Sequence, residues 1–153
     1  MEMPLSTFGA IMGFALKIVE YSVDIYKTGV EKARDPEIKK TFQLLFDEEK
    51  KNYTLMEQVR RENVTEMILE PITGLQQEDY EFEVNLSDQV QDADLLKAAL
   101  VLEEKEQNFF SDSSAKIPLP EVARTFRRIA QKKGKSLAKL KALGLNQLLK
   151  TSL

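Results

Sequence analysis

Apolar residues recur at alternating steps of three and four in four stretches of the chain, the spacing of one buried helix face. The helices predicted from these stretches cover residues about 6–33, 36–63, 92–115 and 120–142. Ser6 can cap the first helix, and Asp35 and Pro36 suit the N-cap and first position of the second. Gly144 is expected to stop the fourth. The pattern predicts an all-α fold, a four-helix bundle forming a single domain over residues 1–153.

The predicted second and third helices are separated by residues 64–91. Tyr80, Phe82 and Val84 alternate there with acidic residues, a period-two pattern that predicts a short extended segment. Helices of about 27 residues are ~40 Å long, and a connection at up to ~3.3 Å per residue can span that length. We therefore expect the second and third helices to lie parallel, joined by one long crossover.

A shift of 84 residues superimposes the first predicted helical pair on the second without a gap. The matched positions are Ala15 with Ala99, Leu16 with Leu100, Glu20 with Glu104, Tyr26 with Phe110, Pro36 with Pro120, Phe42 with Phe126, Leu45 with Ile129 and Met56 with Leu140. Helix restarts and apolar positions coincide in the same register. We therefore interpret the bundle as two copies of one helical hairpin.

Polar residues interrupt the apolar stripes at one level of the predicted bundle. Six stripe positions share this level in the repeat register: Val19, Glu49, Asn52, Glu103, Lys133 and Ser136. Buried polar groups are costly unless they are paired. Two neighbouring buried carboxylates would repel each other, and an ammonium between them supplies the compensating charge. We therefore predict a core ion pair of Lys133 with Glu49, Glu103 or both.

Several short motifs share one register around this level. They are Ile25-Tyr26-Lys27, Asp35-Pro36-Glu37, Phe42-x-x-Leu45-x-x-Glu48-Glu49-Lys50, Leu102-Glu103-Glu104 and Phe109-Phe110. Together they resemble the rubrerythrin-like branch of the ferritin-like di-iron carboxylate family, over nearly the whole chain outside the crossover and tail. The resemblance implies a ferritin-like bundle with one Glu and one Glu-x-x-His per hairpin as metal ligands, and peroxide- or oxygen-reducing chemistry.

This chain fills only two of the six ligand positions that the resemblance implies. Glu49 and Glu103 remain as carboxylates. The other four positions depart from the family pattern and hold Val19, Asn52, Lys133 and Ser136. An ammonium at this level would repel metal ions, so we expect a lost di-iron site, no cofactor and no catalytic residues.

The predicted function is therefore that of a non-catalytic, metal-free relative of rubrerythrin, serving as a structural or interaction module. The alternative is a residual iron- or manganese-binding oxidoreductase of the rubrerythrin type. It would hold a single divalent ion through Glu49, Glu103 and Glu106, with Glu20 as a further ligand. Glu20 could join them only through a one-residue slip that breaks the repeat register.

Composition narrows the chemistry further. The chain has no cysteine and no histidine, which removes thiol catalysis and the commonest general base near neutral pH. A net charge of -3 argues against nucleic acid as a partner. The N-terminus shows no signal-peptide pattern, and the apolar stretch 8–16 is far shorter than the ~20 residues of a membrane span. We therefore expect a cytoplasmic protein that does not enter a membrane.

Two surface features leave alternatives open. The stretch from Phe8 to Leu16 is apolar on nearly every side, which predicts either a homodimer through this face or burial beneath the crossover. The predicted fourth helix is basic through Arg124, Arg127, Arg128, Lys132, Lys135, Lys139 and Lys141. This face is either simply solvated or binds phosphate or an anionic partner, and the acidic crossover could complement it within or between subunits.

Overall fold

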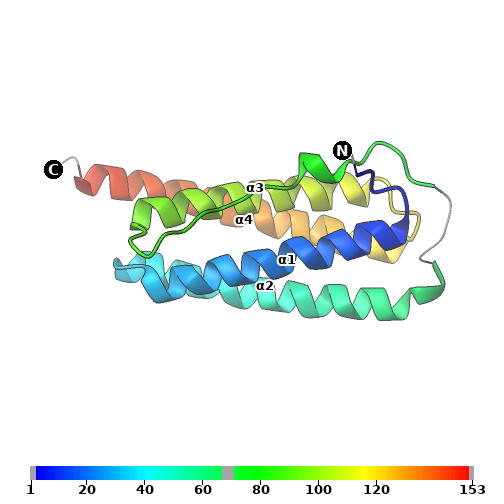
Figure 1. Ribbon diagram of the computed structural model, residues 1–153, viewed down its shortest axis with the longest axis horizontal. Helices are drawn as coiled ribbons and strands as arrows, with labels where there is room; N and C mark the ends of the chain where they lie inside the picture. Colours follow the sequence, from blue (N-terminus) through cyan, green and yellow to red (C-terminus); the bar gives the residue numbers. More distant parts are fainter. Residues whose placement is uncertain (1–2, 67–70, 152–153) are drawn as a thin grey trace.

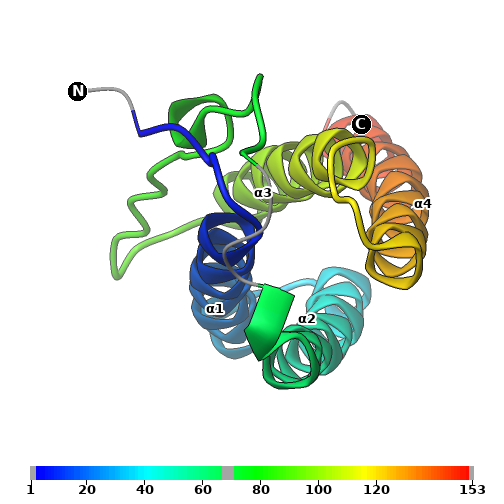
Figure 2. The ribbon, with the colours of Figure 1, turned by 90° about the vertical axis from the view of Figure 1, so that its right-hand side faces the viewer.

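The computed structural model describes residues 3–66 and 71–151. The helices are α1 (Phe8–Lys32), α2 (Pro36–Glu62), α3 (Asp92–Ser114) and α4 (Pro120–Thr151), with two short 3-10 turns, η1 (Val64–Glu66) and η2 (Gln77–Asp79). α1 pairs with α2 and α3 pairs with α4 as two antiparallel hairpins, and the hairpins pack α1 against α3 and α2 against α4 (Figures 1 and 2). The predicted all-α four-helix bundle is confirmed.

The helix starts follow local capping chemistry. Thr7, and not the expected Ser6, caps α1, with its hydroxyl accepting a hydrogen bond from the Ala10 N–H at 3.0 Å. The Asp35 carboxylate caps α2 by accepting from the Glu37 N–H at 2.9 Å, and Pro36 takes the first helical position as predicted. These caps satisfy backbone donors that have no partner inside the helix.

The fourth helix is longer than the sequence pattern predicted. It continues through Gly144 to Thr151, so the expected stop at about Ala142 is wrong. Glycine costs ~1 kcal/mol relative to alanine inside a helix, but it ends one only by adopting positive φ. Gly144 does not have positive φ. A glycine that keeps helical φ does not stop the helix, so α4 continues to Thr151.

The crossover runs the length of the bundle beside α1 and α3 and makes α2 and α3 parallel, as expected (Figure 1). Tyr80 is buried, Phe82 and Val84 are half-buried, and the intervening glutamates are exposed. The predicted alternation therefore holds, although residues 80–86 form no strand. Within the described residues, the Val84 N–H has no neighbouring strand to donate to. It donates instead to the Tyr21 hydroxyl at 2.8 Å.

The apolar core consists of two clusters at opposite ends of the bundle. One contains Phe8, Met12, Met56, Phe109, Phe110 and Phe126, and the other Tyr26, Phe42, Leu45, Leu95, Leu102 and Leu140. In the sequence of each helix, polar buried residues lie between the members of the two clusters. The core is thus divided by a polar level, where the repeat register placed the interrupted stripes.

The apolar stretch 8–16 is largely covered by this chain itself. Ile11 and Met12 are fully buried, and Phe14 is 4% exposed. Leu75 and Tyr80 of the crossover region belong to the same cluster. The structure thus follows the alternative of burial beneath the crossover for these side chains, and the homodimer through this face stays a prediction.

Two glycines of α1 give a test of what covers each face of this helix. A Cβ on Gly13 would meet no atom within 4 Å, whereas a Cβ on Gly29 would overlap the Phe42 ring. We expect Gly13→Ala to raise the free energy of unfolding by ~0.5–1 kcal/mol through helix propensity. Gly29→Ala should lower it by ~1–3 kcal/mol through overpacking.

Urea unfolding followed by circular dichroism measures both effects, and light scattering gives the mass of each variant. If Gly13→Ala proved destabilising and also reduced the mass, a second copy would have to pack against this face. That result would favour the homodimer. Gly29→Ala is the matched control, because the same substitution on the same helix should change the free energy of unfolding in the opposite direction.

Candidate functional site

The polar level of the core collects buried side chains from all four helices. They are Ser22 of α1, Glu49 and Asn52 of α2, Glu103 and Glu106 of α3, and Lys133 of α4. Each lies on the inward stripe of its helix, which is why the fold brings them together. We call these six residues the lysine–carboxylate cluster.

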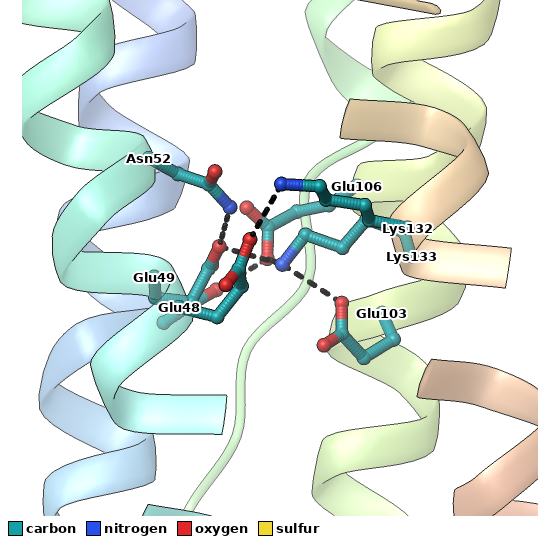
Figure 3. Close-up of polar contacts among 8 residues, drawn as sticks. Glu48, Glu49, Asn52, Glu103, Glu106, Lys132 and Lys133 are labelled. Carbon is teal, nitrogen blue, oxygen red and sulfur yellow. Dashed lines mark hydrogen bonds and ion pairs between the residues drawn. The ribbon is translucent and has the colours of Figure 1, made fainter. Parts of the chain in front are cut away.

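Lys133 is the centre of this cluster (Figure 3). Its Nζ lies 2.6 Å from Glu49 Oε1, 2.8 Å from Glu103 Oε2 and 3.4 Å from Glu106 Oε2. Lys133 is 3% exposed and the three glutamates at most 1%, so all four charges are removed from water. The predicted core ion pair with Glu49 and Glu103 is confirmed, and Glu106 is a third partner.

Neutral side chains complete part of the hydrogen bonding. The Asn52 amide donates to Glu49 Oε1 at 2.8 Å, and the Ser22 hydroxyl donates to Glu106 Oε2 at 2.8 Å. The second oxygens of Glu49 and Glu106 and the Tyr26 hydroxyl are buried without a hydrogen-bond partner among the described residues. A single ammonium therefore serves three carboxylates, and part of the hydrogen-bonding capacity of the cluster is left unsatisfied.

Burial and charge set the protonation of the cluster. Burial raises the pKa of Glu103, Lys133 lowers it and Glu49 raises it again, which leaves it at about 7. Burial and the Glu49 charge raise the pKa of Glu106 well above its ordinary value, against the pull of Lys133. Burial alone would lower the pKa of Lys133, but attraction to the three carboxylates holds it well above normal. Lys133 thus stays an ammonium near neutral pH, and the raised pKa of Glu106 means that this buried carboxyl ionises less readily than an exposed one.

The remaining predicted positions fall outside the cluster. Glu20 is exposed on α1, so the structure does not bring this proposed metal ligand to the site, and the register without a slip is correct. Val19 is buried in the apolar cluster next to the polar level. Ser136 is half-buried in a hollow between α2 and α4 that Lys132 and Lys139 also line.

Ser22 and Glu106 form a contact that the sequence pattern did not single out. Both lie on the predicted stripes and are 84 residues apart, so the repeat register carried the signal. Glu49 with Lys133, and the exposed pair of Glu48 with Lys132, have the same separation. At this level each of these residues contacts the position that matches it in the 84-residue repeat. An approximate two-fold axis therefore lies between the two hairpins at the level of the cluster.

The di-iron centre that the resemblance implies does not fit these residues. The Lys133 ammonium lies within 3.4 Å of an oxygen of each of the three carboxylates. In the part of the chain that the structure describes, no three acidic side chains are placed to hold a metal ion. The positive charge of this site is supplied by the Lys133 side chain.

Comparisons with known proteins support the architecture only. No family model and no curated protein matches the chain. The solved structure of CopM in a silver-bound form, obtained by soaking, aligns with a TM-score of 0.70 and 13% sequence identity. The match covers 90% of this chain and 95% of that chain, and at this identity it shows the fold alone. None of the helices in the described residues combines the length and apolarity that crossing a bilayer requires.

Proposed function

We propose that the protein is a non-catalytic, rubrerythrin-like relative of the ferritin-like proteins, serving as a structural or interaction module. The observation that carries the proposal is the position of the Lys133 ammonium, 2.6 Å from Glu49 and 2.8 Å from Glu103. In this proposal a single lysine supplies the charge compensation that metal ions give in the relatives. The bundle then keeps its buried carboxylates but does not carry out the metal-dependent reduction of peroxide or oxygen that the resemblance implies.

The enclosure of the cluster supports a structural role. Glu49, Glu103, Glu106 and Lys133 are at most 3% exposed, so a substrate has no direct access to them. The chain also contains no histidine to act as a general base near neutral pH. What remains accessible is the surface, and its charged faces suit contacts with a partner.

The alternative of a residual iron or manganese enzyme faces two obstacles. Glu49, Glu103 and Glu106 are already engaged by Lys133, and Glu20 lies exposed elsewhere on α1. A divalent ion would have to displace the ammonium before these carboxylates could bind it. Silver, named for CopM, is not carried over, because a likeness at 13% sequence identity shows the fold alone.

Metal analysis tests the proposal directly. Protein produced with added iron or manganese and then dialysed is expected to retain well below one equivalent of metal per chain, measured by plasma mass spectrometry. Glu49→Gln tests whether any retained metal depends on the cluster, and Glu57→Gln, at an exposed position of α2, is the control. Stoichiometric metal that survives dialysis and is lost in Glu49→Gln would overturn the proposal in favour of the residual enzyme.

A further inference from the structure

A cavity of about 640 Å³ lies between α1 and the crossover and is lined by residues of both. Its floor is apolar and mostly aromatic and consists of Phe14, Ile18, Tyr21, Tyr80 and Phe82. Concave sites of ~300–1,000 Å³ with such floors are typical of small-molecule binding. The site described above contributes no residue to this cavity.

The walls of the cavity are tied together within the chain. The Tyr21 and Phe82 rings meet edge to face with centroids 5.6 Å apart, and the Tyr21 hydroxyl accepts from the Val84 N–H at 2.8 Å. The Tyr80 hydroxyl donates to the Asp112 carboxylate at 2.7 Å, which fixes the other end of the crossover wall to α3. The cavity is therefore formed before any ligand arrives, which lowers the entropic cost of binding.

The rim of the cavity is strongly acidic. It carries five carboxylates and a single ammonium: Glu20, Asp24, Glu78, Glu81, Glu83 and Lys17. Glu78 accepts from the Met3 N–H and Glu81 from the Gln77 amide. The carboxylates of the other three acids make no ion pair or hydrogen bond with any residue in the described ranges. The rim thus presents uncompensated negative charge above an aromatic floor.

The arrangement of these carboxylates distinguishes an organic cation from a metal ion. Within the described residues no three acids lie close enough together to coordinate a metal, so the charge is spread around the floor. An ammonium on an apolar body can lie over aromatic faces and meet spread carboxylates without being stripped of all its water. We propose that this cavity binds an organic cation with an aromatic or bulky apolar body, of the arylalkylammonium class.

A second copy of the chain offers a competing source of positive charge. α4 holds nine of the 22 basic residues and one of the 25 acidic residues of the chain, and it lies on the side of the bundle opposite the crossover (Figure 2). Its lysines and arginines could meet the acidic rim of a neighbour. The concave shape of the cavity favours a small cation instead, because the ring surface that a ligand can reach belongs to the half-buried Tyr21 and Phe82, and a flat helix face would not follow the hollow to them.

Calorimetric titration of the full chain with three probes of one shape tests the proposal: naphthylmethylammonium, naphthylmethanol and naphthylacetate. We expect the cation to bind about tenfold or more tightly than the neutral alcohol, and the anion to bind most weakly. Glu20→Gln combined with Glu83→Gln should weaken the cation about 3–10-fold and leave the alcohol unchanged. The control pair Glu31→Gln and Glu57→Gln removes the same charge from exposed positions outside the cavity and should change neither.

Equal affinity for the three probes, or no binding of the cation at millimolar concentration, would overturn the proposal. Light scattering at low salt without a probe tests the competing partner. Self-association that Glu20→Gln with Glu83→Gln abolishes would assign the rim to α4 of a second copy and would also overturn it. Unlike the proposed function, the cavity depends on no residue of the cluster, so metal retention and probe binding can fail independently.

Discussion

Lys133→Met is expected to lower the free energy of unfolding by ~3–5 kcal/mol near pH 7, because it leaves buried carboxylates without their counter-ion. Lys133 contacts Glu49, Glu103 and Glu106, and at 3% exposure no water replaces it without a change in packing. Urea unfolding followed by circular dichroism measures the loss. The loss should be smaller at acid pH, where the carboxylates take up protons and no longer need the ammonium.

The adjacent lysine gives a matched control on the same helix. Lys132 pairs with Glu48 at 3.4 Å, but the two side chains are 57% and 37% exposed. Lys132→Met should therefore cost less than ~1 kcal/mol. Equal losses for the two variants would show that the core ion pair contributes no more than a surface pair, and the account of the cluster would be wrong.

A combined variant separates the loss of the ion pair from a failure to fold. Lys133→Met with Glu49→Leu, Glu103→Leu and Glu106→Gln removes the unpaired charges as well as the ammonium. Replacing a whole buried ionic group by residues of similar volume is often neutral, so we expect recovery of much of the loss. If the combined variant is less stable than Lys133→Met alone, packing and not charge dominates at this level.

The wild-type protein is expected to lose stability as the pH rises from about 4.5 to about 7 through Glu103. The folded chain holds the pKa of this carboxyl at about 7, whereas the unfolded chain has its ordinary value of 4.5. Between these values the folded state binds more protons than the unfolded state, so the free energy of unfolding falls with rising pH. The contribution is fully present below the lower value and is lost above the higher one. Its size is ~3 kcal/mol at 1.36 kcal/mol per pKa unit.

Glu103→Gln tests this pH dependence at nearly constant shape. The amide oxygen can still accept from Lys133, but it does not titrate. We expect the wild type to gain up to ~3 kcal/mol of unfolding free energy relative to the variant as the pH is lowered from about 8 to about 4, measured by urea unfolding. Glu57→Gln, an exposed position on α2, should leave the wild-type curve unchanged. A parallel pair of curves for wild type and Glu103→Gln would contradict the raised pKa.

Much of the fold and the centre of the site could be predicted from the sequence. Apolar periodicity decides which side of a helix is buried, so it located all four helices, and the Asp35-Pro36 signal fixed the start of α2. The repeat of 84 residues by itself places Glu49, Glu103 and Lys133 at one level. These features depend on neighbours within a few residues or on internal symmetry, and both are visible along the chain.

Only the tertiary structure decided what covers each buried side. Periodicity gives no information about a partner distant in sequence, because that partner is chosen by packing after the helices form. The pairing of Ser22 with Glu106 and the burial of Phe14 by the crossover both depend on such contacts. The acidic cavity depends on them as well, since Tyr21 holds the crossover in place through a backbone group 63 residues away. Local sequence determined the helices and their buried stripes, and non-local packing determined which stripes meet and what space they leave.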